Sequence, residues 1–346
     1  MNQAVKIGVH PLDTARNDIV LDLEPYSPVT HGMLQIHAQV NDGLIESADP
    51  VLGSMHRGVE KLFESRDYRQ ILMLANRHEW LSPITGEVGI AQMLESALGI
   101  TVPEQAVSLR SALIDYSRIT SHLAFLAGFP FADSHLSHQL RSHREVLISH
   151  QQEFIGNRMH PMITRIGGFT HSPNAAWLSQ TQTVTADTHS ITQAVIDYVG
   201  TQTHLHEIGQ LTAQDIAEFS ISGPAVIPGS VADRLKNLAT EIQAAVAQLN
   251  ATIPNLIANI DEPINVLLPK VPRIPEGEYA HSINTPLGTA KWFLVSRGDK
   301  MPYRLKLRPA SLHTVLALSR VLVGTSLEDA KYVVASMPFI TGDAER

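Results

Sequence analysis

The chain has 346 residues, 44% of them hydrophobic, which is enough to bury one large core or two ordinary ones. Its 34 acidic residues exceed its 26 lysines and arginines, so the net charge of −8 argues against a nucleic-acid partner. Cysteine is absent, which excludes disulfides, zinc–thiolate sites, iron–sulfur clusters and cysteine-held nickel built from this chain. We see neither a signal-peptide pattern nor an uncharged apolar run near the ~20 residues of a spanning helix, so any membrane link is expected to come through partners.

The N-terminal part is predicted to contain a β-hairpin. Leu34, Ile36 and Ala38 alternate with polar neighbours, and Asp42-Gly43 offers a tight turn. Residues 54–82 then turn into an amphipathic helical stretch, preceded by the triplet His-Arg-Gly at 56–58.

A helical body follows. Pro83 opens a helix that stops at Gly99, and Pro103 opens a second helix that is apolar over much of its circumference and ends at Gly128. Further helices are predicted at 134–155, at 176–200, after a capping box that begins at Thr212, and at 231–260 with an interruption near Pro254.

The pattern changes to strands near the C-terminus. "EYAHSIN", "AKWFLVS" and "PYRLKLR" predict three strands, and helices are predicted after Ser311 and Ser326. The expected fold is therefore α+β and predominantly helical, with small antiparallel sheets near both ends. We expect one integrated unit with an N-terminal hairpin region at 1–50, a helical body at 51–275 and a C-terminal part at 276–346.

Several stretches together resemble one family. They are "PVTHGMLQIHAQV", "MHRGVEKLFESRDYRQ", "LGITVPEQAVSLRSALIDYSRITSHLAFL", "NRMHPMITRIGGF" and "PYRLKLRPAS". All of them, in order from about residue 25 to the C-terminus, are similar to the D subunit of proton-pumping NADH:quinone oxidoreductase, respiratory complex I. That family is related to the large subunit of nickel–iron hydrogenases, so a hydrogenase-large-subunit-like helical body is implied.

The resemblance implies a peripheral-arm subunit of a membrane-associated oxidoreductase and translocase, inactive as an isolated chain. It would bind no cofactor itself; quinone would be the substrate, and the iron–sulfur cluster would sit in a partner subunit. The implied partners are a cluster-carrying small subunit, a C-type subunit and a membrane heel subunit. The implied location is the cytoplasmic face of the cell membrane. No dinucleotide fingerprint is present, so NADH would be oxidised elsewhere in any such complex.

The same resemblance implies site residues. His31 matches the family's quinone-pocket histidine, and Asp133 lies close to its acidic partner. From the residues alone, a histidine at the position of His31 is more often a polar turn residue than a catalyst, and a helix N-cap explains Asp133 equally well. Arg57 and His160 match residues beside the partner's terminal cluster, where a fixed cation and a titrating imidazole would affect its potential.

Two departures from the family bear on activity. Trp80 stands where the family has a quinone-facing tyrosine, and an indole can donate a hydrogen bond but cannot act as the acid that a phenol is. The segment after "SISGP" is short, as in a shortened paralogue. Hydrogenase chemistry is excluded because "RHEWLS" and "SMPFITGDAER" lack the cysteines that hold nickel. A non-catalytic scaffold and a related membrane-bound complex with another donor or acceptor remain as alternatives.

Overall fold

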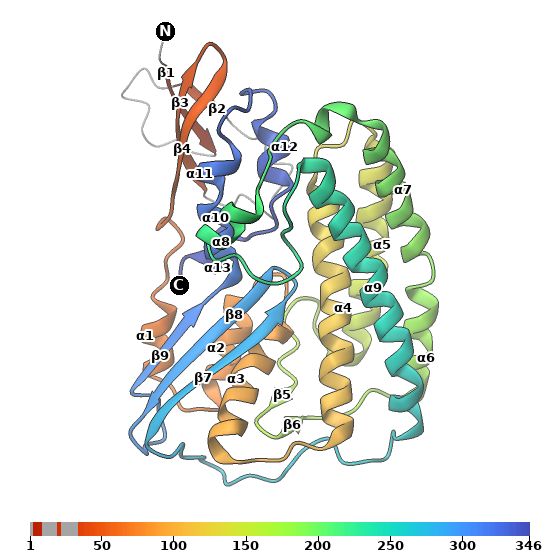
Figure 1. The fold of residues 1–346 in the computed structure, drawn as a ribbon. Helices are drawn as coiled ribbons and strands as arrows, with labels where there is room; N and C mark the ends of the chain where they lie inside the picture. The colour runs from red at the N-terminus through yellow and green to blue at the C-terminus, as the bar shows by residue number, and fades with distance from the viewer. Residues whose placement is uncertain (1–2, 9–18, 22–33) are drawn as a thin grey trace.

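The computed structural model describes residues 3–8, 19–21 and 34–346, with side chains from residue 34 onward. Figure 1 shows three parts: an upright helical bundle, a sheet of three strands backed by short helices, and an N-terminal sheet beside the C-terminal helices. The structure is thus predominantly helical with small, mainly antiparallel sheets near both ends, and the predicted α+β class is confirmed.

The N-terminal sheet has four strands in the order β2-β1-β3-β4. The predicted hairpin is formed by β3 (Gln35–Asn41) and β4 (Leu44–Val51), and Asp42 and Gly43 turn with φ of 49° and 82°. Two strands were not predicted: β1 (Gln3–Gly8) pairs antiparallel with β3, and β2 (Ile19–Leu21) pairs parallel with β1.

The helical bundle is built around α4 (Glu104–Gly128), which packs against α9 and α5. Two predictions in this part were wrong in detail. The helix expected at 176–200 is two helices, residues 175–184 and 188–201, with Thr185 as the C-cap of the first. Pro254 does not interrupt α9, which continues to Ala258. The bundle's other helices are α5 (Ser134–Ile155), α6 (Ala175–Val184), α7 (Thr188–Thr201) and α9 (Val231–Ala258).

Shorter elements connect the bundle to the rest. They are the hairpin of β5 (Thr164–Arg165) and β6 (Gly168–Phe169), the 3₁₀ helix Thr203–His206 and α8 (Ala213–Glu218), which begins with the predicted capping box. Among the residues described here, no helix is long and apolar enough to cross a membrane.

The second sheet covers three helices that follow the N-terminal hairpin. Its strands lie in the order β7-β8-β9, and the buried face, which includes Trp292 and Leu305, packs on the helices. Gly89 of α3 makes this contact possible, since a Cβ there would lie 2.7 Å from the indole nitrogen of Trp292. The elements are α1 (Val59–Glu64), α2 (Gln70–His78), α3 (Pro83–Leu98), β7 (Gly277–Thr285), β8 (Gly288–Ser296) and β9 (Arg304–Arg308).

The C-terminal helices carry the end of the chain back into the molecule. The helix predicted after Ser311 is two short helices, α10 (Ala310–Leu316) and α11 (Leu318–Val321), followed by α12 (Ala330–Ala335) and α13 (Thr341–Ala344). Residues 341–345 are buried. Figure 1 shows α13 beside α10, above the sheet β7–β9.

Candidate functional site

The turn between α2 and α3 meets the C-terminal helix α13. The backbone N–H of Trp80 donates a hydrogen bond to Oδ1 of Asp343 at 3.1 Å, although the two residues are 263 positions apart. Gly342 lies directly against the indole, since a Cβ there would be 2.6 Å from Cζ2 of Trp80. The end of the chain therefore sets the position of Trp80, which is 36% exposed.

Two carboxyl groups are buried behind Trp80. Glu79 is 3% exposed and Asp343 is 1% exposed. Burial raises the pKa of Glu79 to about 7. Burial, and then the negative charge of Glu79, raise the pKa of Asp343 well above its usual range. Two like charges in a poorly solvated site cannot both ionise easily, so this pair holds a proton near neutral pH.

A neutral histidine and the chain terminus complete the buried cluster. Burial, and then the positive charges of Arg57 and Arg346, lower the pKa of His78 to about 3, so its imidazole is neutral at physiological pH. Glu345 accepts a hydrogen bond from the backbone N–H of Met55. These contacts tie the end of the chain to the loop that precedes α1.

Arg57 stands over the outer face of this cluster. Its guanidinium carbon lies 5.6 Å from the centroid of the Trp80 ring, which is a cation–π distance. Its Nη2 donates to the carbonyl of Arg77 at 3.4 Å. Gly58 has a φ of 64° at the N-cap of α1, a left-handed conformation that turns the chain from Arg57 into the helix.

His160 approaches the same surface from the loop after α5. Its backbone N–H donates to Oδ1 of Asn157 at 3.0 Å, and burial together with the charge of Arg77 lowers the pKa of its imidazole. Arg77 also donates to the sulfur of Met162 at 3.6 Å. Of the predicted site residues, Arg57 and Trp80 are thus in contact, whereas His160 is related to them only through the charge of Arg77.

The other two predicted residues are not joined to this cluster by any described contact. His31 lies outside the described residues. Asp133 is exposed and is the N-cap of α5, where its Oδ1 accepts the backbone N–H of His135 at 2.8 Å. Asp133 thus has the geometry of a helix N-cap, which is one of the two roles that its position in the sequence indicated.

Sequence reasoning missed the buried acids. Glu79 adjoins Trp80 in "RHEWLS", and Asp343 lies in the C-terminal "GDAER", but nothing local indicates that the two stretches meet. These are the stretches in which nickel would need cysteines. In this structure the two stretches are joined by the hydrogen bond from the backbone N–H of Trp80 to the carboxylate of Asp343. Among residues 34–346, no group of three potential metal ligands occurs.

Comparison with known proteins first defines the class. The fold is similar to a chain in a solved complex described as "Structure of the membrane-bound sulfane sulfur reductase (MBS), an archaeal respiratory membrane complex". The TM-score is 0.82, the sequence identity 21%, and the match covers 92% of this chain and 96% of that one. The architecture is therefore one found in respiratory membrane complexes.

Sequence comparison then gives the family. The family model described as "Respiratory-chain NADH dehydrogenase, 49 Kd subunit" matches residues 136–233 and 230–346. A D subunit of the NADH-quinone oxidoreductase of Streptomyces griseus, the one numbered 2, is 34% identical, with 95% of this chain and 93% of that protein covered. The D subunit of the same enzyme in Carboxydothermus hydrogenoformans is 26% identical, with 95% and 98% covered. The chain belongs to the family of the 49 kDa, or D, subunit of NADH:quinone oxidoreductase, as its sequence motifs predicted.

Proposed function

We propose that the chain is a peripheral subunit of a complex I-like NADH:quinone oxidoreductase. In this proposal it forms part of the quinone cavity and of the surroundings of an iron–sulfur cluster held by a partner subunit. The small cluster-carrying subunit, a C-type subunit and a membrane heel subunit are the proposed partners, at the cytoplasmic face of the membrane. The observation that carries the proposal is the cluster in which Arg57 covers Trp80 and the N–H of Trp80 is held by Asp343.

The arrangement suits a redox reaction coupled to protons. Reduction of a quinone to a quinol takes two electrons and two protons, and in the proposal the electrons come from the partner's cluster. Trp80 would offer a quinone ring only the part of its indole that Arg57 and Gly342 leave exposed, and it has no acidic proton to give. His31 would supply hydrogen bonding and a proton to a quinone oxygen. Arg57 would favour the reduced state of the nearby cluster through its fixed charge.

Measurements of turnover distinguish this proposal from two alternative functions. A scaffold paralogue would keep the fold and assemble, but substitutions at Trp80 and His31 would not change turnover. A related complex with another acceptor is favoured by one observation, since the structural relative belongs to a sulfane sulfur reductase. Such a complex would turn over with its own acceptor and fail with quinone.

The test is electron transfer from donor to quinone in membranes, normalised to assembled complex. Replacing His31 by Ala should reduce turnover on the order of 10²-fold, the low end for the loss of a general acid. Trp80→Tyr should preserve or raise turnover, because it restores a phenol at that position. An unchanged rate in His31→Ala would contradict the quinone-site proposal and support the scaffold.

A further inference from the structure

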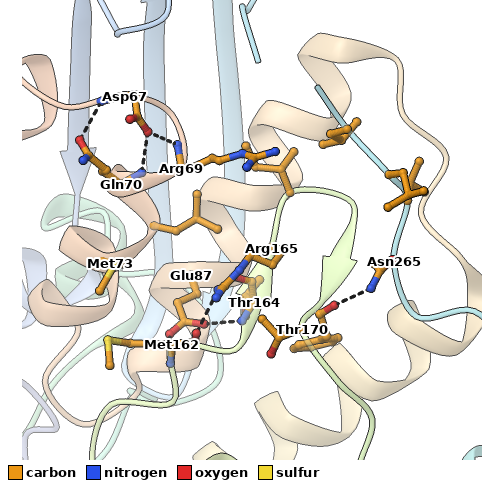
Figure 2. Close-up of a pocket in the computed structure, with 16 residues that line it drawn as sticks. Asp67, Arg69, Gln70, Met73, Glu87, Met162, Thr164, Arg165, Thr170 and Asn265 are labelled. Atoms are coloured by element: carbon orange, nitrogen blue, oxygen red, sulfur yellow. Dashed lines mark hydrogen bonds between the residues drawn. The ribbon is translucent and has the colours of Figure 1, made fainter. Parts of the chain in front are cut away.

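A second concave surface adjoins the Trp80 cluster, since Met162, which accepts a hydrogen bond from Arg77, also lines it. It is a cleft of about 670 Å³ between the start of α2, the β5–β6 hairpin and the segment 265–268. Figure 2 shows how Asn265 reaches from that segment, and its Nδ2 donates to the carbonyl of Phe169 at 3.0 Å. The cleft therefore has walls from three parts of the chain that are far apart in sequence.

The arginines of this surface have no carboxylate partner among the described residues. Arg69 donates to the carbonyl of Pro269 at 2.8 Å, and Arg165 to the carbonyls of Met162 and Thr164 at 3.0 and 2.8 Å. Carbonyl oxygens orient a guanidinium but do not neutralise it. In a chain with eight more acidic than basic residues, unneutralised arginines in one cleft indicate a site for negative charge.

Two acids also line the cleft, but Glu87 is 1% exposed, whereas Arg69 and Arg165 are both exposed. Glu87 lies at its floor in Figure 2, where its carboxylate accepts the backbone N–H groups of Met162 at 2.7 Å and Thr164 at 3.0 Å. Asp67 accepts the N–H groups of Arg69 and Gln70, at 2.9 and 3.0 Å, at the start of α2. Among the described residues, neither carboxylate is within ion-pair distance of an arginine of the cleft.

Apolar side chains stand exposed at the same place. Leu267 is 95% exposed and Met73 is 48% exposed, and both line the cleft. Exposed apolar side chains beside charged groups are typical of protein interfaces, in which arginine and methionine are enriched.

We propose that this cleft binds an acidic segment of a partner subunit, with carboxylates of the segment on Arg69 and Arg165 and an apolar side chain against Met73 and Leu267. A concave wall suits a protruding chain segment better than a flat bilayer surface. The planar fork of arginine matches a carboxylate in two-point contact. The inference rests on the proposed function only in that the partner belongs to the same complex.

The test is photo-crosslinking in the assembled complex in membranes. A benzoylphenylalanine introduced at Leu267 should form a covalent product with one partner subunit, at a peptide that contains Asp or Glu. The matched control is the same probe at Val107 on α4, which is 52% exposed and lies on the bundle; it should not give that product. No product from position 267, or a product with lipid or with a second copy of the chain, would overturn the proposal.

Charge-reversal variants provide a second test of the proposed interface. Arg165→Glu should lower the amount of chain retained on salt-washed membranes by about tenfold, whereas Lys331→Glu, an equal charge change on α12, should not. Changing the mapped acidic residue of the partner to Arg should restore retention in Arg165→Glu. Equal retention in both variants would contradict the proposal. Neither readout depends on quinone turnover, so failure of the quinone chemistry would not be mistaken for failure of this interface.

Discussion

The interior of the molecule buries carboxylates in two opposite ways. In α3, Glu95 forms two hydrogen bonds with Arg110 at 2.7 and 2.6 Å and accepts the N–H of Gly167 at 2.6 Å. At the C-terminal junction, Glu79 and Asp343 are just as buried, but neither forms an ion pair with a described residue; burial and the charge of Glu79 raise the pKa of Asp343, and the charge of Arg57 opposes this rise only in part. The first arrangement is a structural ion pair that joins two helices to the β5–β6 hairpin, whereas the second stores a proton.

The largest effect is expected from breaking the ion pair. Glu95→Ala should lower the free energy of unfolding by about 3–5 kcal/mol, because it leaves the guanidinium of Arg110 buried without its counter-charge. Urea denaturation measures this. Glu145→Ala removes a similar pair, but that contact with Arg158 is exposed, so little change is expected. Equal losses in the two variants would contradict the structural role of Glu95.

The carboxyl pair should make stability depend on pH in a defined direction. The pKa of Glu79 is raised to about 7 in the folded protein from 4.5, so between these values the folded state binds more protons than the unfolded state. The contribution of Glu79 to stability therefore falls by about 3 kcal/mol as pH rises from about 4.5 to 7 and is not regained above 7, whereas the lowered pKa of His78 gives a contribution of the opposite sign below its usual pKa of 6.5.

Glu79→Gln has no such proton to lose. Its unfolding free energy, measured by urea denaturation at each pH, should rise relative to that of the parent over this range and exceed it at about pH 8. Parallel pH curves for the two proteins would show that Glu79 does not hold the proton.

The contact between Gly342 and Trp80 can be tested by adding a methyl group at position 342. Gly342→Ala would place a Cβ 2.6 Å from the indole and should cost about 1–3 kcal/mol through overpacking. Gly200→Ala is the control: it lies in α7 with nothing within 4 Å, so it should be neutral or stabilising. Thermal unfolding of the two variants gives the difference, and an unaffected Gly342→Ala would mean that α13 is not docked on Trp80.

The smallest effect is expected at Asp133. If its function is the observed helix cap, Asp133→Ala should cost about 1 kcal/mol of stability, whereas Asp133→Asn, which keeps a capping oxygen, should cost less. Quinone turnover of the assembled complex should then be unchanged in both. A large loss of turnover in Asp133→Asn with normal stability would instead support the acidic role that the family resemblance implies.

The sequence predicted those features that depend on residues close together in the chain, and it did not predict contacts between residues far apart. Pro83 and Gly99 fixed the ends of α3, and Asp42-Gly43 fixed the hairpin, because these residues act on their own backbone. The break at Thr185 had no Gly or Pro to indicate it.

The candidate site was predictable only in part. Arg57, Trp80 and His160 came from the family resemblance; the structure places Arg57 over the Trp80 ring, and no contact among the described residues joins His160 to either of them. The pairing of Glu79 with Asp343 depends on how the C-terminal helix docks. No local pattern encodes a contact between residues so far apart in the chain.

Infrared spectroscopy of the carboxyl groups as a function of pH would detect the proton stored behind Trp80. At about pH 6 the difference spectrum between the parent and the Glu79→Gln, Asp343→Asn double variant should contain the C=O absorption of a protonated carboxyl, and this band should titrate away near pH 7. A difference spectrum at that lower pH with only ionised-carboxylate bands would contradict a stored proton at this site.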